Sequence, residues 1–164
     1  MVKSAQENLI NSVSIQLANP IDIQIILDYC RALNEEDPDF TGEIHFDKNA
    51  VQAALEELIG NSLLGRAWLI YDDDTPIGYV VLTFGFSLES HGRDGILDEI
   101  YIVQDYRGRG IGTQVMKAVE AEARQLGLKK LYLEVERNNH RAKSLYLKLG
   151  FEDFDRHLLN KRLA

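Results

Sequence analysis

Apolar and polar residues recur along the chain with the spacings of strands and helices in turn. Residues 13–17 alternate apolar and polar side chains and predict a short strand. Asn19 and Pro20 then open a helix that is expected to end near Asn34, because asparagine caps helices and proline suits their first turn. Asp47 is placed to cap a second helix. The apolar stripe of that second helix comprises Val51, Ala54, Leu55 and Leu58.

The middle of the chain predicts an antiparallel meander. Residues 64–71 and 76–86 have the apolar runs of two strands, joined by the polar turn at 72–75. A second polar stretch, 87–95, predicts a turn into a third strand over 96–103. Strands that follow one another through short turns pair antiparallel.

The last third of the chain adds helices between strands. Apolar residues spaced by three or four predict an amphipathic helix over 114–126, and alternation predicts a strand over 130–136. A further helix is capped by Asn138 or Asn139 and terminated by Gly150. The final predicted element is a short hairpin made of residues 151–154 and 158–163.

The predicted order of elements is therefore β-α-α-β-β-β-α-β-α-β-β. The strand–helix–strand unit over 96–135 should be a right-handed parallel crossover, which makes the sheet mixed but mostly antiparallel. We expect one α/β domain over 1–164, with a flexible segment at 1–12, since no linker or repeat interrupts the chain.

Composition and charge narrow the class of protein. The 164 residues carry a formal net charge of -8, which argues against a nucleic-acid partner. No apolar run is long enough for a membrane span and no signal-peptide core is visible, so we expect a cytoplasmic protein without a membrane partner. Cys30 is the one cysteine, and it cannot form an intramolecular disulfide.

A glycine-rich loop, Tyr-Arg-Gly-Arg-Gly-Ile-Gly-Thr at 106–113, joins the strand over 96–103 to the following helix. The first N–H groups of a helix lack internal partners, and the helix dipole adds positive charge there. Glycines let a ligand approach the backbone closely, so the loop is a candidate phosphate cradle. The alternative is a surface turn that happens to hold three glycines.

Two familiar phosphate loops fit this stretch poorly. A Walker A loop needs a lysine before its Ser or Thr, whereas Gly112 precedes Thr113 here. A Rossmann fingerprint needs G-x-G-x-x-G at the start of a doubly wound sheet, and this strand follows antiparallel partners instead. Glu134 or Glu136 could serve as the ribose-binding acid, so a dinucleotide site stays as an alternative.

Three segments together resemble the GNAT superfamily of acyl-CoA-dependent N-acetyltransferases. Arg107-x-x-Gly110-x-Gly112 resembles that family's pyrophosphate loop. Residues 139–151, which read Asn-x-x-Ala-x-x-Leu-Tyr-x-x-x-Gly-Phe, resemble the helix beside the cofactor thiol, and 97–102 resemble the central strand. The resemblance implies the GNAT fold and acetyl-CoA as co-substrate. The strand and loop look most like those of polyamine-type acetyltransferases.

The resemblance also implies how the cofactor is held. Loop backbone N–H groups would bind the CoA pyrophosphate, and they come from Gly108, Arg109, Gly110, Ile111, Gly112 and Thr113. Arg107 and Arg109 would add charge or face solvent. The central strand of the family splays from its neighbour, so the backbone of Ile100 and Ile102 would pair with the pantetheine arm. The Ile102 N–H would polarise the thioester carbonyl. Asn139 would bond the pantetheine arm, cap its helix, or do both.

Catalytic residues follow from the same resemblance. Tyr146 would be the general acid that protonates the departing thiolate, although a tyrosine at this spacing also suits a core position. Asp98 and Glu99 are the candidate bases, and they point to opposite faces unless a bulge realigns them. We favour Glu99 as the base and Asp98 as an amine-binding group, with Glu134 as a third candidate. No metal is expected, because no histidine has a Cys or His at ligand spacing.

The expected reaction is direct attack of a primary amine on acetyl-CoA in a ternary complex. The acidic run at 35–39 favours a small cationic amine if it forms an electrostatic collar, or is simply a solvated helix end. A non-catalytic acyl-CoA-binding regulatory module is the alternative from another class. By analogy with the fold, a homodimer is also expected.

Overall fold

The structure, a computed structural model, describes residues 13–36, 46–154, 158–161 and 163. These residues form two compact units, Met1–Glu134 and Val135–Ala164, each of which is described by itself. The predicted flexible segment at 1–12 and residues 37–39 of the acidic run lie outside the described residues.

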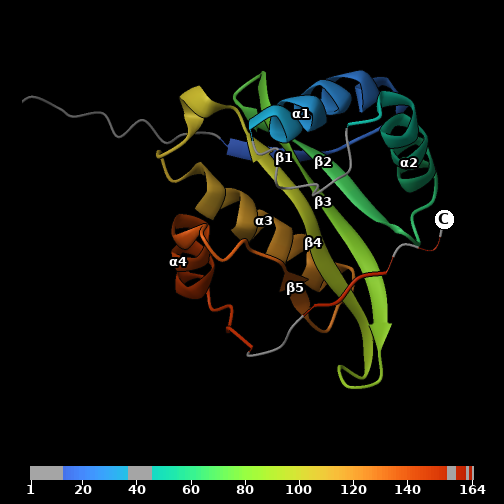
Figure 1. The fold of residues 1–164 in the computed structure, drawn as a ribbon, viewed down its shortest axis with the longest axis vertical. Coiled ribbons are helices and arrows are strands. Elements are labelled where there is room, and N and C mark those ends of the chain that lie inside the picture. Colours follow the sequence, from blue (N-terminus) through green and yellow to red (C-terminus); the bar gives the residue numbers. More distant parts are fainter. Residues whose placement is uncertain (1–12, 37–45, 155–157, 162, 164) are drawn as a thin grey trace, which may run out of the picture. The chain divides into compact units, whose positions relative to one another are not determined.

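The first unit is built on a five-stranded sheet in which the strands stand in sequence order (Figure 1). The strands are β1 (Val13–Leu17), β2 (Gly65–Asp72), β3 (Thr75–Ser87), β4 (Gly92–Ile102) and β5 (Leu131–Leu133). The first four pair antiparallel, and β5 runs parallel to β4. The predicted mixed, mostly antiparallel sheet is confirmed, and it differs from the parallel sheet of a Rossmann fold.

Two helices pack on one face of this sheet. A 3-10 turn, η1 (Pro20–Asp22), leads into α1 (Ile23–Glu36), and α2 (Lys48–Gly60) follows. The predicted caps are present, since the side chains of Asn19 and Asp47 accept hydrogen bonds from the first turns. Buried residues of α1 and α2 pack with every second residue of the strands, among them Leu69, Tyr79 and Tyr101.

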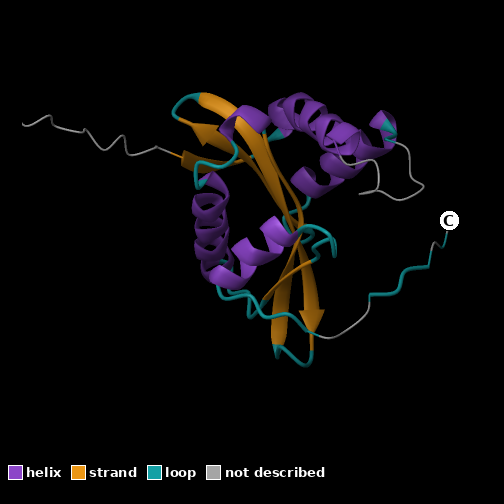
Figure 2. Ribbon diagram, turned by 60° about the vertical axis from the view of Figure 1, so that its left-hand side comes forward, coloured by secondary structure: helices purple, strands orange, loops and turns teal. Residues whose placement is uncertain are grey.

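The third helix, α3 (Ile111–Gln125), lies on the opposite side of the sheet (Figure 2). Its predicted apolar stripe is buried, and Val115 and Val119 are fully enclosed. The sheet residues of the other parity, such as Trp68 and Ile70, are buried as well, because successive side chains of a strand point to opposite faces. With both faces covered, the ends and edges of the strands are what the sheet offers to a ligand.

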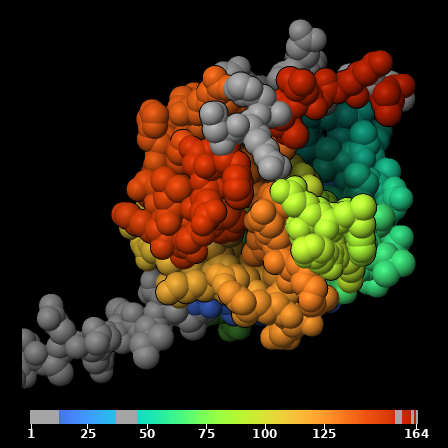
Figure 3. Space-filling view, turned by 90° about the horizontal axis from the view of Figure 1, so that it is seen from below, coloured from blue at the N-terminus to red at the C-terminus, as the bar shows by residue number. Residues whose placement is uncertain are grey.

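The predicted polar turn at 87–95 is half wrong, because β4 already begins at Gly92. The residues from Gly92 to Gly95 lack a strand pattern, yet they pair with β3, and the Lys129 N–H donates to the Arg93 carbonyl at 2.8 Å. Only four residues, 88–91, turn the hairpin. Figure 3 shows its yellow-green tip from below, beside the orange end of α3 and the start of β5.

Two other predictions about strands also differ from the structure. The strand expected over 130–136 is only three residues long, because β5 pairs with β4 solely along Gly95, Ile96 and Leu97. In the second unit, α4 (His140–Lys148) is capped by Asn139 and followed by Gly150 at a φ of 91°, as predicted. The predicted C-terminal hairpin is wrong for the described residues after α4, which form no strand.

Candidate functional site at the glycine loop and the edge of β4

The glycine loop turns the chain from β4 into α3. A 3-10 turn, η2 (Gln104–Tyr106), follows β4, and the loop ends where α3 begins at Ile111, three residues earlier than predicted. Gly108 and Gly110 both have a φ of 80°, a left-handed conformation that glycine adopts without strain. A Cβ added to Gly110 would meet no atom within 4 Å, so the outer side of this turn is open.

The start of α3 presents backbone donors that the helix itself does not use. Gly110 is the N-cap residue and has no side chain to cap the helix. The first bond of the helix runs from the Gln114 N–H to the Gly110 carbonyl at 3.3 Å, so the N–H groups of Ile111, Gly112 and Thr113 take no part in the helical ladder. Three donors at the positive end of a helix, next to left-handed glycines, suit a pyrophosphate. The residues present therefore fit the CoA group that the sequence implied.

Beside this loop, β4 is irregular and one of its edges is open. Val81 of β3 pairs with Glu99 and Leu82 with Leu97, so Asp98 is an extra residue, a β-bulge. A bulge that can realign Asp98 and Glu99 is thus present. The neighbouring strand β5 stops pairing at Leu97, one residue before the bulge.

The register of β4 shows which backbone groups face that open edge. The Val103 N–H donates to the Ile77 carbonyl at 2.9 Å, which makes Gly78 and Ile102 a non-hydrogen-bonded pair. The N–H and C=O of Ile102 therefore point away from β3, and those of Ile100, two residues earlier, do the same. No strand of the described sheet pairs with them on that side. An extended pantetheine arm could add there as a strand would.

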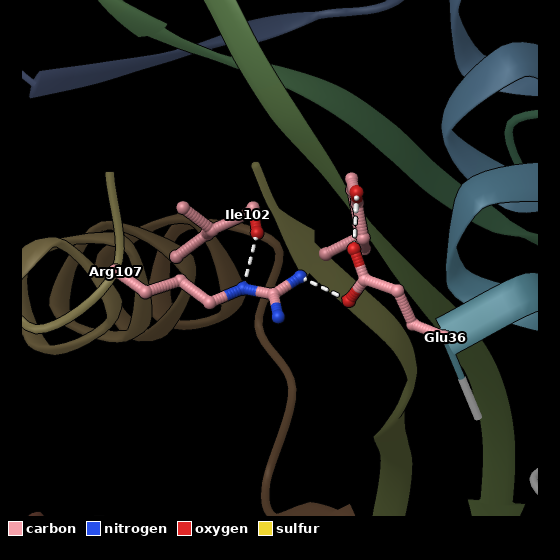
Figure 4. Close-up of polar contacts among 4 residues, drawn as sticks. Glu36, Ile102 and Arg107 are labelled. Carbon is pink, nitrogen blue, oxygen red and sulfur yellow. Dashed lines mark hydrogen bonds and ion pairs between the residues drawn. The ribbon is translucent and has the colours of Figure 1, made fainter. Parts of the chain in front are cut away.

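Arg107, expected to add charge to the cradle or to face solvent, is exposed and also bonded within the protein. Its Nε donates to the Ile102 carbonyl and its Nη2 to Glu36, each at 2.6 Å (Figure 4). The second oxygen of Glu36 accepts from the Tyr101 hydroxyl at 3.0 Å, and the guanidinium lies 5.2 Å from the Tyr101 ring centroid. Arg109 is exposed and lies over the ring of Tyr106. The two arginines of the loop thus have different surroundings.

Glu99 is the more enclosed of the two strand acids. It lies on the α1 face of the sheet, where the Tyr79 hydroxyl donates to its carboxylate at 2.7 Å and the Cys30 thiol lies 3.9 Å away. Burial raises the pKa of Glu99, the negative charge of Asp98 raises it further, and the bonds from Tyr79 and Cys30 oppose the rise. A carboxylate with a raised pKa is a stronger base, as proton abstraction requires.

Asp98 and Glu99 lie close enough to interact electrostatically, because the bulge interrupts the strict alternation between them. Asp98 reaches the surface, although partial desolvation raises its pKa too. Two neighbouring carboxylates attract a cation, so the pair suits an ammonium group. Glu134, the third candidate, is exposed directly after β5.

Tyr146 and Asn139 belong to the second unit. Tyr146 is half-buried on α4, with its ring centroid 5.8 Å from that of Phe151 in an edge-on arrangement. Desolvation raises the pKa of the Tyr146 phenol, so it stays protonated at neutral pH. The Asn139 side chain accepts from the Ala142 N–H at 3.0 Å, which establishes its role as a cap.

Several partners in the first unit have no local signal in the sequence. Tyr79 and Cys30 lie in apolar runs, and Glu36 is one member of an acidic run. Each acts through a partner far away in sequence, such as Arg107, which is 71 positions from Glu36. Burial raises the pKa of Cys30 to about 12, so its thiol stays protonated beside Glu99.

Two features are absent among the described residues. No three His, Cys, Asp or Glu side chains among them are grouped in a way that could hold a metal ion. No helix among them is sufficiently long and apolar to cross a membrane.

Comparison with known proteins identifies a matching family model and similar sequences. A model of the acetyltransferase (GNAT) family matches residues 28–151. Thialysine N-epsilon-acetyltransferase of Bos taurus is 39% identical over 77 residues, which are 47% of this chain and 45% of that protein. N-alpha-acetyltransferase of Saccharolobus solfataricus is 32% identical over 87 residues, 49% and 52% of the two chains. The chain thus spans about half the length of these curated relatives.

Solved structures share the fold over most of the chain. An integron cassette protein from the metagenome of the Cole Harbour salt marsh is 29% identical, with a TM-score of 0.79, covering 92% of this chain and 90% of that one. A predicted acetyltransferase from Clostridium acetobutylicum, solved with acetyl-CoA, is 20% identical, with a TM-score of 0.75 and coverage of 91% and 96%. At 20% identity the second likeness concerns the fold alone.

Proposed function

The chain belongs to the GNAT family of acetyltransferases, and on that premise we propose that it moves the acetyl group of acetyl-CoA to the primary amine of a small cationic compound. The observation that carries the proposal is the loop in which Gly108 and Gly110 adopt left-handed conformations before the free N–H groups of α3. This anion site follows β4 directly, where the strand's edge is open at Ile100 and Ile102.

The residues of the first unit divide the binding of acetyl-CoA between them. The backbone of residues 108–113 holds the pyrophosphate, while Ile100 and Ile102 pair with the pantetheine arm. The Ile102 N–H donates to the thioester oxygen and stabilises the negative charge that develops there during attack. Asn139 of the second unit serves the same arm in addition to capping α4.

Proton transfers complete the reaction. The Glu99 carboxylate takes a proton from the ammonium group, whose nitrogen then attacks the carbonyl carbon as the C–S bond breaks. Tyr79 and Cys30 hold Glu99 in place, and Asp98 attracts the cation. The Tyr146 phenol gives its proton to the departing thiolate, and the second amine proton, which the nitrogen loses as the amide forms, restores the phenol. Each transfer contributes on the order of 10²- to 10⁴-fold in rate.

The cationic character of the amine is supported by the two adjacent carboxylates of the bulge and by the net charge of -8. Relatives named for N-epsilon acetylation of thialysine are compatible with a small amine. A polyamine, a diamine or an amino-acid side chain has the required chemistry.

The test is release of CoA thiol from acetyl-CoA across a panel of primary amines that carry one, two or more positive charges, with monoamines of equal length as controls. We expect turnover that rises with the number of positive charges. Equal turnover of monoamines and more highly charged amines would remove the preference for a cationic compound. CoA binding without turnover of any amine would favour a non-catalytic acyl-CoA-binding module.

A further inference from the structure

Two of the three guanidinium nitrogens of Arg107 are bonded within the protein. Its Nε and Nη2 are bonded to the Ile102 carbonyl and the Glu36 carboxylate (Figure 4), and its central carbon lies 5.2 Å from the centroid of the Tyr101 ring. A planar guanidinium makes such fixed, two-directional contacts, whereas lysine presents one point charge. The loop's first arginine therefore joins three elements, namely the end of α1, the end of β4 and the loop itself.

The charges of this group compensate one another. Glu36 neutralises Arg107, and its other oxygen is occupied by the hydroxyl of Tyr101, whose side chain is only 6% exposed. The ion pair itself is about one-third exposed on each side, at 37% and 36%. An exposed ion pair alone stabilises little, but here it adds to charge-assisted hydrogen bonds and an aromatic contact.

The bond to Ile102 links this group to the proposed cofactor edge. The N–H and C=O of Ile102 face the same open side of β4, and Arg107 occupies the carbonyl. The N–H is left as the available donor at that position. Arg107 therefore fixes the backbone at the end of β4, where the chain leaves the strand for the loop.

We propose that Arg107 and Glu36 are a pair of positioning residues that set the geometry of the cofactor loop, and that Arg107 is not a ligand of the pyrophosphate. The inference rests on the proposed function, because it concerns the same acetyl-CoA site. It adds Glu36, on the last turn of α1, to the residues on which acetyl-CoA affinity depends.

The two possible roles of Arg107 make opposite predictions for Glu36. If Arg107 bound phosphate directly, Glu36→Gln would free its charge and tighten CoA binding or leave it unchanged. If the pair positions the loop, Glu36→Gln and Arg107→Leu each weaken binding, and the double variant is little worse than either single one, because both remove the same interaction. Arg107→Lys keeps the charge but cannot make both bonds, so it weakens binding as well.

The experiment is calorimetry of CoA binding to the full chain, together with KM for acetyl-CoA, kcat and melting temperature. We expect a loss of about three- to tenfold in CoA affinity for each single variant, the range for a lost charge-assisted hydrogen bond with partial exposure. The weaker binding should appear as a higher KM for acetyl-CoA, with kcat nearly unchanged. Glu35→Gln is the matched control, since it removes the same charge from the exposed neighbouring residue.

The outcomes separate the two proposals. A wild-type chain that binds no CoA would overturn the proposed function and this inference with it. Wild-type binding of CoA, combined with unchanged or tighter binding by Glu36→Gln, would overturn the inference alone. Wild-type affinity in Arg107→Lys would also overturn it, because charge without the fixed geometry would then suffice.

Discussion

Replacing Gly110 with alanine distinguishes an effect on cofactor binding from an effect on the stability of the fold. Gly110 has a φ of 80°, and a Cβ there would meet no protein atom within 4 Å. The substitution therefore causes no clash and costs only the left-handed conformation, about 1–2 kcal/mol. Lower entropy of the unfolded chain offsets about 0.4–1 kcal/mol of this. The net loss of about 1 kcal/mol corresponds to about 2–4 °C in melting temperature for a chain of this size.

The chain offers a matched control at the other end of the same helix. Gly127 has a φ of 74° and equally open surroundings. Gly127→Ala should therefore lower the melting temperature by a similar amount. It lies away from the helix start, where the free N–H groups are, so it should leave CoA binding unchanged.

The comparison measures melting temperature and CoA affinity for both variants. Gly110→Ala adds a methyl group within the proposed cradle, so we expect CoA affinity at least about tenfold weaker, or about 1.4 kcal/mol. Equal CoA affinity in the two variants, with equal melting temperatures, would refute the cradle at residues 108–113. A large stability loss in Gly110→Ala alone would refute the account of the turn as open.

Further predictions concern three groups, Glu99, Tyr146 and Cys30. Burial raises the pKa of Glu99, so its charged form destabilises the fold as pH rises above the ordinary carboxylate range. Glu99→Gln should therefore raise the melting temperature at pH 7 and raise it less at pH 4. Thermal unfolding at the two pH values measures both changes. The same variant should lose about a hundredfold in kcat, and wild-type activity should fall as pH drops through the raised pKa, as a pH–rate profile would show. Tyr146→Phe should reduce kcat at saturating acetyl-CoA by about tenfold or more with CoA affinity retained, and an unchanged kcat would remove its role as the acid. Cys30, with a pKa of about 12 and a buried thiol, should resist a colorimetric thiol reagent at pH 8 until the chain unfolds, whereas rapid reaction in the native state would contradict its enclosed position.

Local signals in the sequence predicted most elements and the glycine turn between β4 and α3. Apolar spacing marked the helices and the meander, and cap residues such as Asn19, Asp47 and Asn139 marked where helices start. The loop was predicted as a candidate anion site because glycines between a strand and an amphipathic helix have a specific use in anion binding. In these cases the signal lies in the residues of the element itself.

The features that were not predicted depend on contacts between distant segments. The start of β4 at Gly92 rests on pairing with β3, since its glycines and charged residues have no strand preference of their own. The length of β5 depends on where β4 stops offering a regular edge, next to the bulge at Asp98. The direction of Arg107 depends on Glu36, 71 positions away, and no local pattern connects the two.

The most direct test of acetyl transfer to an amine is a single turnover with acetyl-CoA labelled in the acetyl group, using excess protein and the best amine of the panel. Direct transfer predicts that all label lost from acetyl-CoA appears on the amine and that none stays on the protein after denaturation. It also predicts that no label leaves acetyl-CoA when the amine is omitted. Label bound covalently to the chain, or label released as acetate without any acetylated amine, would contradict direct transfer.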